Sequence, residues 1–261
     1  MGLLGDPVAH SRSPMMQNAA FTALGLDWVF VAFPAPARRG GPAVRALLDL
    51  GIAGLNVTMP HKADAATVCD DLSLDAERLG AVNTVVADPG AGRLTGHNTD
   101  GQGFLRALAD EGIDPAGARF LVLGAGGAAR AIALALGAIG ASVTVAARRP
   151  EQARAAAALG NGTAVELTDA VIEECDVLVN ATPVGMKGEP PTVDAGRLGP
   201  GQFVYDTVYP VETPLLVQAR ERGVPCAGGI GMLVHQGALA FRLWTGHDAP
   251  LDVMRAAAHE A

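Results

Sequence analysis

The sequence predicts an α/β protein with a mainly parallel sheet. The first observation is that strand-like segments, rich in aliphatic and β-branched residues, alternate with helix-like segments along the chain. The second is composition, because 49% of the 261 residues are hydrophobic and can bury a substantial core. The length suits one large α/β domain or two modest ones.

The first half of the chain predicts short elements separated by glycine and proline. Ser13 and Pro14 have the types of an N-cap and a first-turn proline, so a helix begins there and ends at Gly25. A loop at 88–92, rich in Gly and Pro, predicts a hairpin. We expect strands at 28–33, 55–58, 82–87 and 93–96, and a helix at 41–50.

The second half alternates more regularly. A buried strand at 120–123 leads through a Gly-rich turn into a helix at 128–136. Neither an internal repeat nor a low-complexity linker is visible, so a boundary near 100–103 is inferred only from the change of pattern. The other expected elements are strands at 142–147, 177–180 and 203–206, and helices at 213–222 and 232–244.

Charge and cysteine content exclude several classes of protein. A net charge of −8 argues against nucleic acid or an anionic membrane as the main partner. The three cysteines lie far apart without a CxxC pair, so neither a disulfide framework nor a zinc site is expected. With no signal peptide visible at the N-terminus, we expect a soluble, cytoplasmic protein.

A Gly-rich turn after the strand at 120–123 predicts a nucleotide site. The run Gly124-Ala-Gly126-Gly127-Ala128-Ala129 fits the pattern G-x-G-x-x-A between a strand and a helix. Such glycines permit a tight turn and let the backbone approach a pyrophosphate at the helix N-terminus. The alternative interpretation is that the glycines only allow the turn to pack closely and bind no nucleotide.

The next strand ends at Arg148 and Arg149, about 20 residues after the Gly-rich turn, where an NAD enzyme usually carries Asp or Glu. Arginine suits a 2′-phosphate because it is charged and donates two parallel hydrogen bonds. The sequence therefore favours NADP over NAD. The alternative is a solvated basic start of the following helix.

Several further segments are too polar, or too unusual in composition, to serve only as scaffold. Taken with the Gly-rich turn, they resemble the shikimate dehydrogenase family over essentially the whole chain. The matching segments, in order, are GDPVAHSRSP, GLNVTMPHK, GAVNT, GHNTDGQGF, GAGGAARA, NATPVGM, YDTVYPVETPLL and GIGMLVHQGALAFRLW.

The resemblance implies an enzyme that reduces 3-dehydroshikimate to shikimate with NADPH. It also implies two α/β lobes: a substrate-binding domain at 1–100, completed by 232–261, and a Rossmann-type NADP-binding domain at 101–231. The family includes monomers and dimers, so a monomer or a homodimer is expected. Where the family often has Asn-Arg-Thr, this chain has Ala147-Arg148-Arg149, so Arg148 keeps the arginine position while the flanking residues differ.

The resemblance also assigns roles to single residues. Lys62 and Asp100 correspond to the family's catalytic pair. The substrate would be bound by Ser11, Ser13, Thr58, Asn83, Tyr209 and Gln236, and its hydroxyls would also meet Asp100. Besides the Gly-rich turn and the two arginines, the cofactor would be bound by Asn180, Thr182, Val208, Gly229 and Met232.

These residue types suit the chemistry. Hydride transfer to a ketone needs a proton for the new alkoxide, which a lysine ammonium can donate. A neighbouring carboxylate orients that lysine and keeps it charged. His61 and His97 flank these segments without metal-ligand spacing, and we expect them at the edge of the site or on the surface.

Each role also has a structural alternative. Asp100 is a suitable N-cap for the helix that follows it, and Ser13 for the first helix. The side chain of Asn83 is suited to hydrogen bonds with loop backbone groups. Gln236 is suited to an internal hydrogen bond, and Met232 to packing in the hydrophobic core.

Three rival functions stay open. One is an NAD-dependent quinate/shikimate dehydrogenase of the same fold. Another is a ligand-binding relative that has lost activity, against which the intact Lys62 and Asp100 argue. The third is a related enzyme on a similar cyclic substrate, such as an aminoshikimate dehydrogenase.

Overall fold

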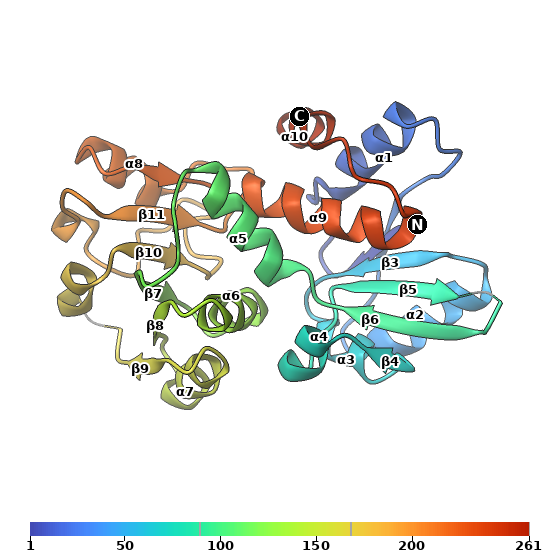
Figure 1. The fold of residues 1–261 in the computed structure, drawn as a ribbon, viewed down its shortest axis with the longest axis horizontal. Helices are drawn as coiled ribbons and strands as arrows, with labels where there is room; N and C mark the ends of the chain where they lie inside the picture. Colours follow the sequence, from blue (N-terminus) through green and yellow to red (C-terminus); the bar gives the residue numbers. More distant parts are fainter. Residues whose placement is uncertain (89, 168, 261) are drawn as a thin grey trace. The chain divides into compact units, whose positions relative to one another are not determined.

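The computed structural model describes residues 1–88, 90–167 and 169–260 of the chain (Figure 1). The chain forms two compact units, which we call unit 1 (Met1–Gly103 with Leu233–Ala261) and unit 2 (Phe104–Met232). Both boundaries fall inside helices, α5 (Asp100–Asp110) and α9 (Ile230–Thr245). Within the described part of the chain, no helix has the length and apolar character needed to cross a membrane.

Unit 1 is built on a mixed sheet with the strand order β2-β1-β3-β5-β6-β4. β1 runs parallel to β2 and β3, whereas β5 runs antiparallel to β3 and β6. The strands are β1 (Gly2–Gly5), β2 (Val31–Pro34), β3 (Gly54–Val57), β4 (Asp71–Leu72), β5 (Thr84–Asp88) and β6 (Arg93–His97). The helices wholly within this unit are α1 (Ser13–Ala23), α2 (Gly40–Asp49), α3 (Lys62–Ala66), α4 (Leu74–Leu79) and α10 (Leu251–His259).

Unit 2 is a doubly wound sheet with the strand order β12-β11-β10-β7-β8-β9. All pairs between its described strands are parallel, and the order reverses between β7 and β10. The strands are β7 (Arg119–Leu123), β8 (Ser142–Ala146), β9 (Thr163–Val165), β10 (Val177–Asn180), β11 (Phe203–Asp206) and β12 (Cys226–Ala227). Its helices are α6 (Gly127–Ala138), α7 (Pro150–Leu159) and α8 (Pro214–Glu221), with 3₁₀ turns η1 (Asp169–Glu174) and η2 (Ala195–Arg197).

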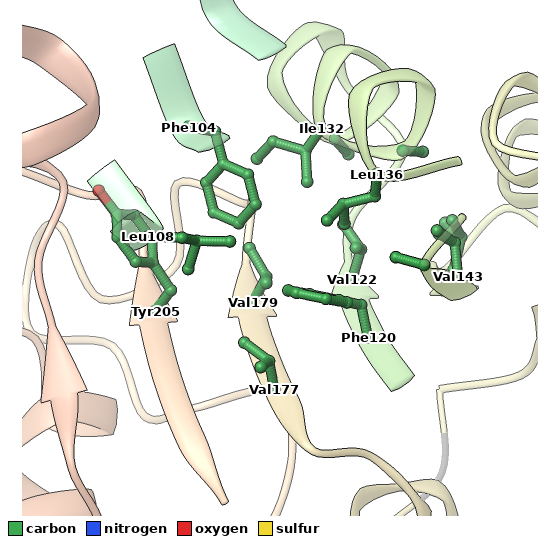
Figure 2. Close-up of a cluster of buried hydrophobic side chains, with 14 of the residues drawn as sticks. Phe104, Leu108, Phe120, Val122, Ile132, Leu136, Val143, Val177, Val179 and Tyr205 are labelled. Atoms are coloured by element: carbon green, nitrogen blue, oxygen red, sulfur yellow. The ribbon is translucent and has the colours of Figure 1, made fainter. Parts of the chain in front are cut away.

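The two faces of the unit 2 sheet are both covered, which explains its almost continuously apolar strands. On one face, Phe104 of α5 meets Tyr205 of β11 edge to face, with ring centroids 5.1 Å apart (Figure 2). Ile132 and Leu136 of α6 belong to the same buried cluster. On the other face, Leu216 of α8 belongs to a second cluster with alternate residues of the same strands. The sheet is therefore held firmly from both sides, and its carboxyl edge is left to carry loops.

The α/β fold class and most predicted elements of the second half are confirmed. β10 and β11 coincide with the predicted strands, and the antiparallel pairing of β5 with β6 confirms the hairpin. Pro89, within the predicted hairpin loop, lies outside the described residues. The sheet of unit 1 is more mixed than a mainly parallel sheet, because this hairpin is inserted into it.

Two predictions near the N-terminus were wrong. The strand predicted at 28–33 begins only at Val31. The reason is that the side-chain amide of Asn18 forms both hydrogen bonds of the Phe30 backbone: it donates to Phe30 O and accepts from Phe30 N. Ser13 is the first residue of α1 rather than its N-cap, a position that Arg12 holds with no capping hydrogen bond from its side chain to the described backbone of α1.

The prediction also missed short or peripheral elements. These are α3, α4, α10, β4, β9 and β12. Most are too short to show a hydrophobic period. α4 did carry a local signal, since Ser73 caps it by accepting from Ala76 N.

Candidate active site

Three segments meet at one edge of the unit 1 sheet. β3 runs antiparallel to β5, with Asn56 opposite Thr84, so the residues after β3 lie beside those before β5. β5 runs antiparallel to β6, with Thr84 opposite His97. The segments that follow β3, precede β5 and follow β6 therefore come together there. These segments carry most of the polar motifs of this unit.

Lys62 and Asp100 form an ion pair at this edge. Lys62 begins α3, and its carbonyl oxygen accepts a hydrogen bond from Val82 N at 2.8 Å, which ties it to the segment before β5. Lys62 Nζ lies 2.6 Å from Asp100 Oδ2. The side chains are 19% and 10% exposed, so the pair is largely withdrawn from water but still reachable by a small molecule.

Asn83 connects Asp100 to the rest of the site. Its Nδ2 donates to Asp100 Oδ1 at 2.8 Å and to Thr99 Oγ1 at 3.0 Å. Its Oδ1 accepts from Thr99 N at 2.9 Å and from Thr84 Oγ1 at 3.0 Å. All hydrogen-bonding positions of the Asn83 amide are thus occupied by protein groups, one of them the backbone N–H of Thr99 in the loop after β6, as the structural alternative for Asn83 predicts. A substrate hydroxyl that bonds to this amide must therefore replace one of these partners.

The carboxylate of Asp100 is not used as a helix cap. Both its oxygens face Lys62 and Asn83, and no backbone N–H of α5 donates to it among the described residues. The N-cap alternative for Asp100 was therefore wrong. The backbone N–H of Asp100 donates to Asn98 Oδ1 at 3.2 Å, which helps to fix the start of α5.

α9 brings Gln236 to the same network. Thr99 Oγ1 donates to the backbone oxygen of Gln236 at 3.1 Å. The side chain of Gln236 is partly exposed, and its Nε2 donates to Leu233 O at 2.8 Å. The Oε1 of Gln236 is the atom that stays available for a ligand, since no hydrogen bond reaches it within the described residues.

The predicted serines lie at the start of α1, which packs directly on α9. Ser13 N donates to Ser11 Oγ at 3.2 Å, so the two hydroxyl residues are neighbours in space. Gln17 Nε2 donates to Gly237 O at 3.0 Å, and a Cβ at Gly237 would strike the side chain of Met16. No hydrogen bond in the described parts of the chain joins Ser11 or Ser13 to the Lys62–Asp100 pair.

Thr58 follows β3 and is partly exposed. Its backbone N–H donates to Leu4 O at 2.8 Å, and its carbonyl oxygen accepts from His61 N at 3.0 Å. The backbone of Thr58 thus anchors the turn that leads to Lys62.

Two buried polar residues of the site were not predicted to have a role. Asn56 Nδ2 donates to Asn83 O and Thr84 Oγ1, but its Oδ1 is buried without a partner among the described residues. His61 is fully buried, not on the surface, and its Nε2 lies 2.7 Å from Ala35 O. The signal for Asn56 was available, because an amide inside a buried strand needs partners.

The Gly-rich turn of unit 2 has the geometry of an anion site. Gly124 adopts φ +108°, and a Cβ there would lie 2.9 Å from Ala181 O, so only glycine fits. A Cβ at Gly126 would meet nothing within 4 Å. α6 begins at Gly127 with no side-chain cap, which leaves its first N–H groups for a ligand.

The two alanines at the start of α6 differ in burial. Ala129 is fully buried in the same hydrophobic cluster as Ile132 and Leu136, so its small side chain lets α6 lie close to the sheet. Ala128 is only partly buried, and its backbone N–H belongs to the first turn of α6.

Arg148 and Arg149 follow β8 at the same carboxyl edge of the sheet and precede α7. Both are exposed, and neither forms an ion pair with another described residue. Two unpaired guanidinium groups beside a helix start are suited to a phosphate group.

The loops after β10 and β11 carry the other predicted cofactor residues. Asn180 Oδ1 accepts from Thr182 Oγ1 at 2.6 Å. Val208 O accepts from Gly229 N at 3.2 Å, and a Cβ at Gly229 would clash with Thr207 O. Tyr209 lies on the same loop as Val208 and is partly buried.

Met232 belongs to the buried core of unit 2 and is 7% exposed, as its structural alternative predicts. Its backbone N–H donates to the hydroxyl of Tyr205 at 3.0 Å. The first turn of α9 is thereby fixed to β11.

Chemically, unit 1 offers a proton donor held by a carboxylate, and unit 2 offers an anion-binding helix start with nearby arginines. Burial also lowers the pKa of His97, at the end of β6, below its usual range. Within the described residues, no cluster of His, Cys, Asp and Glu has the make-up of a metal site.

Family models match three parts of the chain. Residues 3–85 match the shikimate dehydrogenase substrate binding domain, and residues 229–259 match the shikimate 5′-dehydrogenase C-terminal domain. Residues 119–189 match a family described as NADP oxidoreductase, coenzyme F420-dependent.

Relatives match over the whole length. A shikimate dehydrogenase (NADP⁺) from Methanopyrus kandleri is 48% identical, with 100% of this chain and 94% of the relative covered. The chain belongs to the shikimate dehydrogenase family. Members of the family also share its structure: shikimate 5-dehydrogenase from Thermus thermophilus, in complex with NADP(H) and shikimate, has a TM-score of 0.91 at 41% identity, covering 98% of this chain and 97% of that one.

The fold is shared by an enzyme of different specificity. Quinate dehydrogenase from Corynebacterium glutamicum, in complex with NAD, has a TM-score of 0.90 at 36% identity, covering 98% of this chain and 96% of that one. Fold alone therefore does not separate these substrates, and the residues of the site must distinguish them.

Proposed function

We propose that this chain is an NADP-dependent shikimate dehydrogenase, which catalyses the reversible reduction of 3-dehydroshikimate to shikimate. The observation that carries the proposal is the 2.6 Å ion pair between Lys62 and Asp100, placed where a small molecule can reach it. Relatives up to 48% identical over the full chain carry the same enzyme name, which supports the reaction and the cofactor.

We assign the two halves of the reaction to different domains. Residues 1–100 with 232–261 bind the polyol acid, and residues 101–231 bind the dinucleotide. The family models support this division, since the substrate binding domain matches residues 3–85 and an NADP oxidoreductase family matches 119–189.

The residues present fit NADP. The uncapped start of α6 and the open space at Gly126 suit a pyrophosphate, and Arg148 with Arg149 suits the 2′-phosphate. When bound, NADPH supplies the hydride that reduces the ketone. The loops after β10 and β11 lie at the carboxyl edge next to the point where strand order reverses, the usual place for a dinucleotide.

Lys62 supplies the proton. Its Nζ donates to the oxygen of the reduced carbonyl in 3-dehydroshikimate, and takes the proton back from the hydroxyl in the reverse direction. Asp100 holds Nζ in place through Oδ2, while Asn83 fixes the orientation of the carboxylate through Oδ1. Because Lys62 is 19% exposed, water can restore its proton between turnovers.

Polar groups of unit 1 select the substrate. Ser11 and Ser13 are assigned to the carboxylate, and Thr58, Asn83 and Gln236 to the ring hydroxyls. A substrate that lacks one of these hydroxyls leaves a buried or partly buried polar group of the protein without a hydrogen-bond partner. That cost is the physical basis for discrimination between substrates.

One assay tests the proposal against its rivals. Purified protein is mixed with shikimate or quinate and with NADP or NAD, and formation of the reduced nicotinamide is followed by absorbance. We expect rapid turnover only of shikimate with NADP. Turnover of quinate with NAD would favour the quinate dehydrogenase alternative, and no turnover with any pair would favour a ligand-binding relative.

We also propose that the protein acts in the cytoplasm as a monomer or homodimer. Sedimentation velocity with and without both ligands measures the oligomeric state, and a larger assembly would contradict this proposal.

A further inference from the structure

Asp206 is a fully buried carboxylate at the end of β11 that the proposed reaction does not use. It forms no ion pair with any cation in the described part of the chain. Burial raises its pKa above the ordinary value of 3.8, and neighbouring hydrogen-bond donors oppose that rise. A buried acid without a cation costs free energy, so its presence calls for an explanation.

Three donors from three different segments converge on this carboxylate. Asn180 Nδ2, at the end of β10, donates to Oδ1 at 3.0 Å. Val208 N, in the loop after β11, donates to Oδ1 at 2.9 Å. Thr213 Oγ1, the N-cap of α8, donates to Oδ2 at 2.6 Å. One side chain thus joins the end of β10, the β11–α8 loop and the start of α8.

The bonds continue from Asn180 to the Gly-rich turn. Asn180 Oδ1 accepts from Thr182 N and Thr182 Oγ1, and Val184 N donates in turn to Thr182 Oγ1 at 3.2 Å. Thr182 packs against Gly124, where a Cβ would lie 2.9 Å from its Cγ2. Asp206 therefore orients the amide of Asn180, and that amide fixes the loop that borders the Gly-rich turn.

The bonds also continue from Val208. Its N–H is held by Asp206, while its carbonyl oxygen accepts from Gly229 N at 3.2 Å. Four predicted cofactor contacts, on three separate segments, are thus linked through one carboxylate. A carboxylate suits this position because it accepts from all three donors, whereas an amide would have to turn its NH₂ toward Thr213 Oγ1, which would then accept instead of donating.

We propose that Asp206 is a positioning residue for the dinucleotide: it holds the loops after β10 and β11 in the arrangement that binds the nicotinamide half of NADP. This inference rests on the proposed function, and it adds a residue that touches neither substrate nor cofactor. It concerns nucleotide affinity rather than the proton transfer carried by Lys62.

The test is the Asp206→Asn variant, which keeps the size of the side chain and turns one acceptor into a donor. Dissociation constants for NADPH and NADH are measured without shikimate, by the fluorescence of the reduced nicotinamide. We expect both to rise about tenfold, or about 1.4 kcal/mol, while the KM for shikimate stays within about twofold. The KM for NADP should rise more than kcat falls.

The matched control is Asp176→Asn. Asp176 also lies beside a strand of this sheet and accepts hydrogen bonds, but it precedes β10 and pairs with Arg119 at the opposite edge. It should lower thermal stability and leave nucleotide affinity unchanged. An Asp206→Asn variant that behaves in the same way, with a lower melting temperature but unchanged nucleotide affinity, would overturn the inference.

Thr213 provides a second pair of variants if Asp206→Asn does not fold. Thr213→Val removes the hydroxyl that donates to Asp206, and Thr213→Ser keeps it. We expect a twofold to fivefold rise (roughly, for a partly lost hydrogen bond) in both nucleotide dissociation constants for Thr213→Val, and wild-type values for Thr213→Ser. Equal values for the two variants would contradict the inference.

The same data separate this inference from the proposed function. The wild-type preference between NADPH and NADH tests the proposed cofactor, whereas the ratio of variant to wild type tests Asp206 with either nucleotide. A wild-type protein that bound neither nucleotide would overturn both proposals.

Discussion

Asp100, in unit 1 just after β6, and Asp206, the last residue of β11 in unit 2, are both buried carboxylates, yet their partners differ in kind. Asp100 pairs with the ammonium of Lys62 and with one amide. Asp206 accepts only from neutral donors: an amide, a hydroxyl and a backbone N–H. A carboxylate paired with an ammonium group is suited to a role in proton transfer, whereas one held by neutral donors is suited to setting loop geometry.

Exposure separates the two carboxylates as well. The side chain of Asp100 is 10% exposed and Lys62 is 19% exposed, whereas Asp206 is fully buried. A ligand can therefore reach the first carboxylate but not the second. Substitution of the first should act on kcat, and substitution of the second on nucleotide affinity.

The largest expected effect is that of Lys62→Ala. Because Lys62 donates its proton mainly in the transition state, kcat should fall by about 10²–10⁴-fold with little change in the KM for shikimate. Initial rates over a range of shikimate concentrations measure both constants. Lys187→Ala, at an exposed lysine of unit 2, is the control. An unchanged kcat in Lys62→Ala would remove Lys62 from the mechanism.

Asp100→Asn sharpens the comparison directly. The new amide still offers an oxygen to Asn83, but it has no charge with which to hold Lys62. We expect kcat to fall by about 10–10³-fold, while the dissociation constants for both nucleotides stay unchanged. A rise in the nucleotide dissociation constants without a fall in kcat would mean that Asp100 and Asp206 do not divide these roles.

A double substitution tests the two arginines after β8. Arg148→Ala with Arg149→Ala removes the groups suited to the 2′-phosphate, so the KM for NADP should rise about 10–100-fold and that for NAD far less. Steady-state kinetics with each nucleotide measure the ratio. Equal losses for NADP and NAD would show that the arginines serve only the structure.

The smallest expected effect concerns stability against pH. Hydrogen bonds from the Arg119 guanidinium and the Arg119 backbone hold the pKa of Asp176 below its ordinary value of 3.8. Asp176 therefore contributes stability above about pH 3.8 that is lost as the pH falls through its folded pKa. For Asp206, whose pKa is raised, the sign is opposite, and its contribution is lost as the pH rises through its folded pKa.

Melting curves of Asp176→Asn at several pH values check this prediction. The variant should melt lower than wild type near neutral pH, by a few degrees (roughly, for an exposed pair), and the difference should shrink in acid. A difference that stays constant down to the lowest pH would contradict the assigned cause.

Much of the fold was readable from the chain itself. The second half was predicted well because its strands are buried on both faces and bounded by glycines, so β10 and β11 were found without error. In the first half, the limits of β2 were wrong because Asn18, from α1, fixes Phe30 outside the ladder. Contacts of that kind have no local signature.

The α/β class, the Gly-rich turn with its following arginines, and the polar segments that resemble the family were all visible in the amino-acid sequence. These are local patterns, in which the residue types alone carry the chemistry. How these residues are used depends on contacts that form only in the folded chain. The tertiary structure placed Lys62 Nζ 2.6 Å from Asp100, used all the hydrogen bonds of Asn83 inside the protein, and buried Asp206 among three donors. The physical reason is that hydrogen bonding and burial depend on which segments the sheets bring together, and residues far apart in the chain give no sign of that meeting.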